Sequence, residues 1–132
     1  MRGCAGSTRI SLALYSHLDI SVQMKISFYT TNSGRSPVED FIRSLPKSDQ
    51  ARFLDVYEGI EEFGLNCPRV QFRQLSGKLW EIKFSAPSGG FRIAYAVVDK
   101  DQMIWLHAFR KTTQKTPAAD LKIAEKRMGE VL

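Results

Sequence analysis

The sequence predicts a single α+β domain, in which a small, mainly antiparallel sheet packs on an αα-hairpin and is followed by a C-terminal helix. Three segments, 79–84, 91–98 and 103–109, alternate at period two and are rich in aromatic and β-branched residues. The connections between them are too short for a crossover helix, so these strands form an antiparallel meander. Two amphipathic helical patterns precede the meander and a third follows it.

The 132 residues suit one domain, which we place at 24–132. Residues 1–23 contain a short apolar run behind two arginines, which faintly resembles a signal peptide but has no clean cleavage site. Met24 begins an alternating strand and is the better candidate for the natural start. We therefore expect residues 1–23 to be a loosely ordered and dispensable extension.

Strong local signals mark the two helices that follow the first strand. Ser36 is expected to cap the first helix, with Pro37 at its first position and Glu39 completing a capping box. Pro46 ends this helix, and a second runs over 48–63. Their apolar stripes predict an αα-hairpin that packs on the sheet.

The strands at 79–84 and 91–98 predict one packed face and one open face. Their large apolar residues alternate with a second set that contains Glu81, Lys83 and Arg92 over a floor of small side chains. Residues 69–73 lead into the first of these strands. We expect the second set to form a shallow charged groove on the open face.

The third strand of the meander, 103–109, is apolar on both faces, as in a central strand, and carries His107 near its end. The basic stretch 110–115 then crosses the strand ends. Thr116 is expected to cap the last helix, with Pro117 as its first residue.

The net charge of +5 is distributed unevenly. Residues 24–68 hold five Lys/Arg and seven Asp/Glu, a net of −2, whereas residues 69–132 hold twelve and six, a net of +6. A basic surface of this kind indicates a polyanionic partner, nucleic acid or an acidic protein, although solvated surface charge gives the same totals.

The sequence also argues against several classes of protein. Cys4 and Cys67 form neither a disulfide framework nor a metal-ligand spacing, so we expect a reducing cytoplasm and no metal. No apolar run approaches the roughly 20 residues that span a bilayer. Neither a Gly-rich phosphate loop nor a Ser/His/Asp set is present, and we expect no cofactor.

Three motifs carry a resemblance to a known family: GKLWEIKF at 77–84, GFRIAYAV at 90–97 and LHAFRKTTQKTP at 106–117. With the order of elements over 24–132, they resemble the HigB/RelE toxins of bacterial type II toxin–antitoxin systems, in the phage-related HigB branch. The resemblance implies a RelE-like fold and a metal-independent endoribonuclease (mRNA interferase) that cuts mRNA on the ribosome. It also implies a cognate antitoxin, commonly a HigA-like helix-turn-helix protein, bound in a toxin–antitoxin hetero-oligomer.

The resemblance and the chemistry of RNA cleavage together indicate the candidate residues. The family's catalytic basic positions correspond to Lys78 or Lys83, to Arg92, and to Arg110 or Lys111. The tyrosine that some members carry beyond the last strand has no match here. We expect Arg92 to bind the scissile phosphate, because its planar guanidinium group presents several hydrogen-bond donors from a rigid strand.

The proton-transfer groups and the RNA contacts complete the prediction. Glu81 or His107 is a candidate general base, and Tyr95 a weaker candidate acid. Each has a structural alternative, since Glu81 can simply pair with a neighbouring cation and His107 can be a core histidine. Residues outside the catalytic set that are expected to contact RNA are Arg73, Thr113, Gln114 and Lys115.

Two further functions share the same fold. One is a ParE-like toxin that blocks DNA gyrase without cutting RNA, and the other is an inactive module that binds nucleic acid or protein. Arg92 and the basic stretch 110–115 are the features that favour the ribonuclease, because gyrase inhibition needs no polar groove.

Overall fold

The computed structural model describes residues 23–132, so the expectations for residues 1–22 lie outside the described chain. The elements run in the order β1 (Lys25–Phe28), α2 (Pro37–Arg43), α3 (Lys47–Phe63), η1 (Gly64–Asn66), β2 (Gln71–Ser76), β3 (Leu79–Ala86), β4 (Gly89–Asp99), β5 (Gln102–Arg110) and α4 (Ala118–Val131). No helix within this described stretch is long and apolar enough to cross a membrane.

The strands form one five-stranded sheet in the order β1-β5-β4-β3-β2. β1 is parallel to β5, and the other neighbours are antiparallel, so the predicted α+β class and mainly antiparallel sheet are confirmed. The meander has one strand more than predicted, because the expected lead-in at 69–73 extends into β2. Most side chains of β2 are exposed, as on an edge strand, and the apolar alternation that reveals a strand is weak there.

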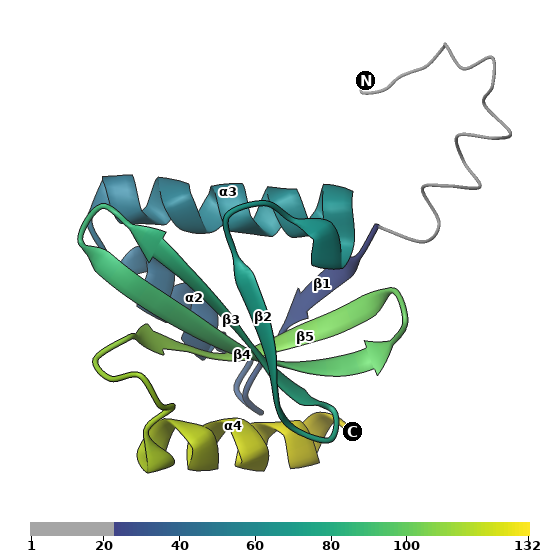
Figure 1. Ribbon diagram of the computed structural model, residues 1–132. Helices are drawn as coiled ribbons and strands as arrows, with labels where there is room; N and C mark the ends of the chain where they lie inside the picture. The colour runs from purple at the N-terminus through teal and green to yellow at the C-terminus, as the bar shows by residue number, and fades with distance from the viewer. Residues whose placement is uncertain (1–22) are drawn as a thin grey trace, which may run out of the picture.

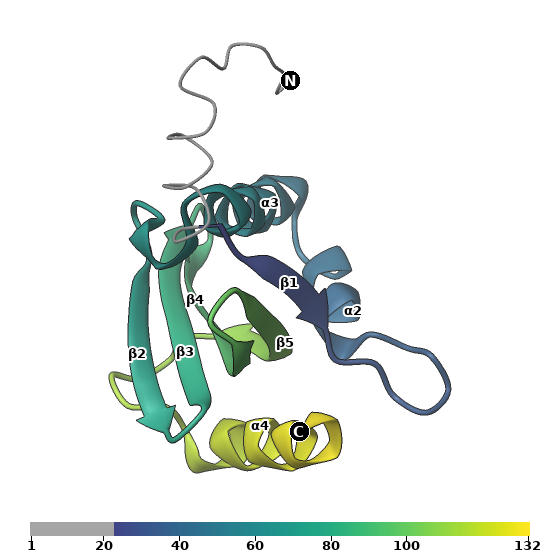
Figure 2. The same ribbon diagram turned by 90° about the vertical axis from the view of Figure 1, so that its right-hand side faces the viewer.

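Helices cover both faces of the sheet. Figures 1 and 2 show α3 on one side of the strands and α4 on the other, with α2 beside α3. The main core lies under α2 and α3 and includes Phe53, Ile60 and Trp105, all at most 1% exposed. A smaller core lies under α4. The molecule therefore has three layers, and both faces of the sheet are partly buried.

The predicted open face is wrong where α4 packs. Ala94 and Ala96, the expected floor of the groove, are buried in the smaller core with Leu79, Leu106 and Ala124 of α4. Small side chains let a helix approach a sheet closely, so the floor that seemed to leave room for a ligand accommodates the last helix instead.

The helix starts agree only partly with the sequence signals. Ser36 caps α2 as predicted, because its Oγ accepts a hydrogen bond from the Glu39 backbone N–H at 3.3 Å. α3 begins at Lys47, one residue before the predicted start. Thr116 does not cap α4, which begins at Ala118 with Pro117 at the cap position and no side-chain cap.

An irregularity in β5 sets the direction of His107. Ala94 pairs with His107 and the next residue, Tyr95, pairs with Trp105, so Leu106 is an extra residue in β5. Leu106 packs in the smaller core, and His107 contacts α4 through Asp120. Consecutive residues of β5 therefore both face the last helix.

Candidate functional site

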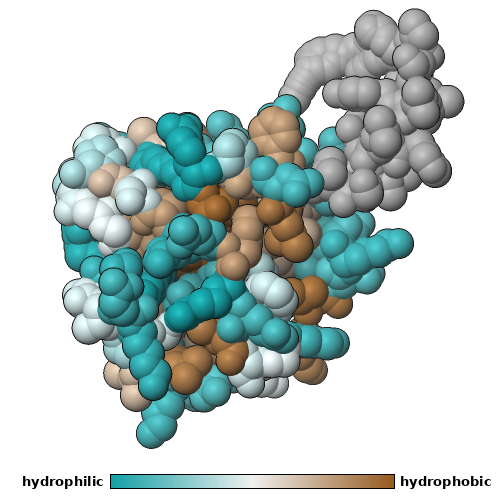
Figure 3. All heavy atoms as spheres, in the orientation of Figure 1, coloured by the Kyte–Doolittle hydropathy of each residue, from teal (hydrophilic) through white to brown (hydrophobic). Residues whose placement is uncertain are grey.

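A depression of about 400 Å³ lies along the pair of strands β2 and β3. The residues that line it are Gln71, Phe72, Arg73, Glu81 and Lys83. Gln71 pairs with Lys83 across the strands, and Arg73 pairs with Glu81, so the four polar residues share one face. Figure 3 views the molecule from the side where β2 crosses in front of the sheet, and hydrophilic residues lie there among hydrophobic ones.

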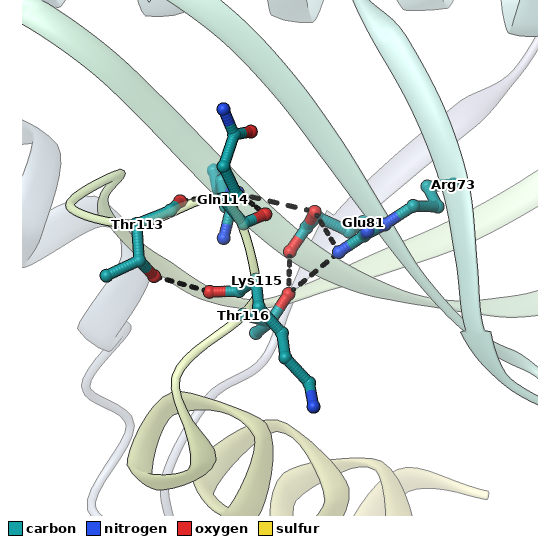
Figure 4. Close-up of polar contacts among 7 residues, drawn as sticks. Arg73, Glu81, Thr113, Gln114, Lys115 and Thr116 are labelled. Carbon is teal, nitrogen blue, oxygen red and sulfur yellow. Dashed lines mark hydrogen bonds and ion pairs between the residues drawn. The ribbon is translucent and has the colours of Figure 1, made fainter.

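Glu81 forms the floor of the depression and is only 2% exposed. Its Oε1 accepts a hydrogen bond from Thr116 Oγ1 at 2.6 Å, and its Oε2 accepts one from Arg73 Nη2 at 3.3 Å. Oε2 also lies 3.6 Å from Arg92 Nε. Figure 4 shows Arg73 and Glu81 converging on Thr116. The carboxylate therefore holds two cations and one hydroxyl in place.

Arg92 is 1% exposed, which contradicts the predicted open groove at this position. Its Nη2 donates to the carbonyl oxygens of Thr113 at 2.9 Å and Gln114 at 2.6 Å, while Nε and Nη1 have no hydrogen-bond partner among the described residues. The segment before α4 therefore lies over Arg92. A buried guanidinium requires a counter-ion and acceptors, and Glu81 and these carbonyls supply them.

The side chains of Lys83 and of the segment 113–115 take no part in the ion pairs of the site. Lys83 is half-buried beside Arg92 across β3 and β4, and no ion pair is formed by its ammonium within residues 23–132. Lys115 is exposed, and in Figure 4 its side chain points away from Glu81. Thr113 and Gln114 bind Arg92 through their backbone carbonyls, and both residues are exposed.

Three other predicted basic residues lie apart from the depression. Arg110 stacks over Phe91, with its guanidinium carbon 4.8 Å from the ring centre, and donates to Ser88 Oγ at 3.0 Å. Lys111 lies against Gly90, where its side-chain carbons would contact any added Cβ at 3.3–3.9 Å. Lys78 stands in the turn before β3, about 16 Å along the chain from Lys83 at 3.3 Å per residue.

The side chain of His107 binds the last helix, α4. Its Nε2 lies 2.8 Å from Asp120 Oδ1, and its ring stacks on Phe109. Desolvation lowers the pKa of His107, and the hydrogen bond and charge of Asp120 partly offset this effect. The imidazole therefore links β5 to the first turn of α4, and among the described residues it forms no hydrogen bond or ion pair with Glu81, Arg73 or Arg92.

Tyr95, the weaker candidate acid, lies in the main core away from the depression. It is 1% exposed, packs in the main core beneath α2 and α3, and has its pKa raised by burial. Alternation along β4 directs it to the face opposite Arg92.

Three residues of the site were not predicted from the sequence. Gln71 and Phe72 lie on the strand that the sequence signals only partly revealed, and Thr116 was expected to cap α4. Nothing in the local sequence distinguishes a capping threonine from one whose hydroxyl bonds a distant strand. Within residues 23–132 no three His, Cys, Asp or Glu side chains are grouped as metal ligands are.

The mixed sheet between an αα-hairpin and a C-terminal helix is compatible with the RelE-like fold. The profile of the family described as phage derived protein Gp49-like (DUF891) matches residues 40–129. The chain therefore belongs to the phage-derived Gp49-like family, which is a RelE/HigB-like toxin family. A toxin of this kind has an antitoxin partner in general. None of the curated proteins compared with the chain matches it.

Proposed function

We propose that this protein is the toxin of a type II toxin–antitoxin system and that it inhibits translation by cutting mRNA on the ribosome. The observation that carries the proposal is the depression on β2 and β3, where Arg73 and Lys83 place two cations around a buried carboxylate. RNA is polyanionic, and the half of the chain that contains this depression carries a net charge of +6.

The proposed reaction is attack of a ribose 2′-hydroxyl on the adjacent phosphorus. The O2′–P bond forms, the bond from phosphorus to the 5′-oxygen breaks, and the 2′ proton is transferred away while the 5′-oxygen gains a proton. Positive charge beside the phosphate stabilises the pentacoordinate dianion through which the reaction passes. Lys83, whose ammonium is unpaired within the described chain, is our candidate for this role.

The geometry argues against both predicted bases. Glu81 already binds Arg73, Arg92 and Thr116, and His107 already binds Asp120. A general base must be free to reach the 2′-hydroxyl, so we assign Glu81 to holding the site together and His107 to linking β5 to α4. Arg92 is assigned to the segment 113–114, whose carbonyls it binds, rather than to the scissile phosphate.

The partner in this proposal is an antitoxin whose acidic or amphipathic arm covers the depression. Charge complementarity favours this arrangement, because the αα-hairpin half carries a net of −2 and the sheet half +6. A helix-turn-helix antitoxin of the HigA type is the form that the sequence resemblance favours. Toxicity is then expected only when the toxin exceeds the antitoxin.

The test is induced expression of the full chain with mapping of RNA 5′ ends on translated messages. New ends within coding sequences support the ribonuclease, and Lys83→Ala should reduce them by roughly 100-fold, as for loss of one group that stabilises a transition-state charge. Lys100→Ala is the matched control, since Lys100 is an exposed lysine in the turn between β4 and β5. Growth arrest without new RNA ends but with gyrase inhibition would support the ParE-like alternative instead.

A further inference from the structure

The side chain of Thr116 is engaged away from the helix that it precedes. The residue is 8% exposed, and its Oγ1 donates to Glu81 Oε1 at 2.6 Å and accepts from Arg73 Nη2 at 3.2 Å. Asp120, the acidic residue in the first turn of α4, is likewise bound to His107. Thr116, which the sequence predicted as the cap, and Asp120 in the first turn therefore both bind residues of the sheet.

Arg73 is fixed at one nitrogen and free at the others. Nη2 donates to both Glu81 Oε2 and Thr116 Oγ1, whereas Nε and Nη1 make no hydrogen bond within residues 23–132. The side chain is 53% exposed and borders the depression. One end of the guanidinium is thus anchored to buried groups, while the exposed side chain as a whole borders the space in which we place the RNA.

We propose that Thr116 is a positioning residue, which together with Glu81 orients Arg73 so that its free donors bind an RNA phosphodiester. This inference rests on the ribonuclease function proposed above and assigns RNA binding at the depression to the orientation of Arg73. An arginine on an edge strand samples many rotamers when it is unrestrained. Contacts that restrict it before RNA arrives reduce the ordering that binding requires.

Thr116 is separable from the charge balance of the site. The charge of Glu81 is balanced by the guanidinium groups of Arg73 and Arg92. Because the Thr116 hydroxyl is neutral, removing it leaves this balance unchanged. The hydroxyl does place a hydrogen-bonding atom between Glu81 and Arg73. Removing the hydroxyl is therefore expected to loosen Arg73 and weaken RNA binding, while the cleavage rate at saturation, which we assign to Lys83, changes less.

The experiment compares Thr116→Val, which replaces the hydroxyl by a methyl group, with Thr116→Ser, which keeps it. The full chain is titrated against ribosomes programmed with an mRNA whose 2′-hydroxyls at the cleavage site are methylated, so that binding is measured without cleavage. Thr112→Val is the control, because Thr112 is exposed and its hydroxyl forms no hydrogen bond within the described chain. The same pair of Thr116 variants is also made in an Arg73→Met background.

Thr116→Val should raise the Kd roughly three- to tenfold, the range for loss of one ordinary hydrogen bond, while Thr116→Ser and Thr112→Val stay near wild type. In the Arg73→Met background, Thr116→Val should add less than about twofold. Affinity for RNA falls with salt, and Arg73→Met should make this dependence shallower. The magnitude of the slope of log affinity against log salt should decrease by roughly 0.7, the value for one phosphate contact on a single strand.

Two outcomes overturn the inference alone. One is a Thr116→Val protein that binds as wild type although Arg73→Met binds weakly, and the other is an undiminished Thr116→Val effect in the Arg73→Met background. If wild type binds programmed ribosomes no better than ribosomes without mRNA, the proposed function fails and the inference falls with it. Should Thr116→Val not fold, Arg73→Lys replaces it: one ammonium cannot contact Glu81 and Thr116 and still offer a planar fork, so unchanged binding would also overturn the inference.

Discussion

Replacing Arg92 by methionine tests whether this arginine is part of the protein's framework. Methionine keeps a long side chain but removes the charge and both hydrogen bonds to the carbonyls of Thr113 and Gln114. It also leaves Glu81, which is 2% exposed, without its buried counter-ion. Breaking a buried ion pair by removing one partner typically costs about 3–5 kcal/mol.

That loss converts into a large change in thermal stability. At an unfolding entropy of about 2.1 cal/mol/K per residue, a domain of roughly 110 residues loses about 13–22 °C in Tm for such a change. The assay is thermal unfolding of the purified protein followed by circular dichroism. Arg35→Met is the control: Arg35 pairs with Asp40 on the surface, with side chains 75% and 48% exposed, and its loss should shift Tm by a few degrees at most.

A second variant separates the charge effect from packing. In Glu81→Leu/Arg92→Met both charges are replaced by apolar groups, so no uncompensated charge remains buried, and much of the lost Tm should return. An Arg92→Met protein that melts within a few degrees of wild type would refute the assignment of Arg92 to the framework. Arg92 would then be free for the role at the scissile phosphate that the sequence predicted.

Three further predictions concern the extension, the histidine and the basic loop. Deleting residues 1–23 should leave Tm within a few degrees, since the capped helix and the sheet lie beyond them; a collapse of stability would mean that the segment docks on the core. Because the pKa of His107 is lowered in the folded protein, the unfolded chain takes up its proton first, so stability should fall as the pH drops through about 6.5. His107→Gln should lose less Tm than wild type between about pH 7.5 and pH 5.5, and equal losses would show that His107 is not responsible. Lys115→Ala should reduce mRNA cleavage less than Lys83→Ala, with an effect that shrinks at high salt because Lys115 is exposed; a salt-independent loss would place Lys115 at the reaction centre.

The fold was largely predictable from local patterns. The capping of α2 by Ser36, the αα-hairpin and the antiparallel meander follow from signals within a few residues of each element. Such signals are strong where a strand or helix buries one face, because burial fixes the period of its apolar residues. β2 was only partly recognised, since an edge strand with mostly exposed side chains has no such constraint.

The candidate site was predicted as a set of residues but not as an arrangement. The sequence places Glu81, Lys83 and Arg92 on one face through strand alternation, and the structure agrees. It does not reveal that the segment 113–114 folds back over Arg92 or that α4 occupies the floor of small residues. Both depend on contacts between residues more than 20 positions apart in the chain.

The sequence by itself determined the α+β class, the order of most elements and the basic character of the sheet half, because these depend on local periodicity and charge. Only the tertiary structure decided which charged residues are available to a ligand. A strand pattern gives the direction of a side chain but not what lies above it, and the same alternation fits an exposed Arg92 or a buried one. The cover over Arg92, and with it the shift of the candidate site towards Arg73 and Lys83, follows from the packing of α4 and the segment that precedes it.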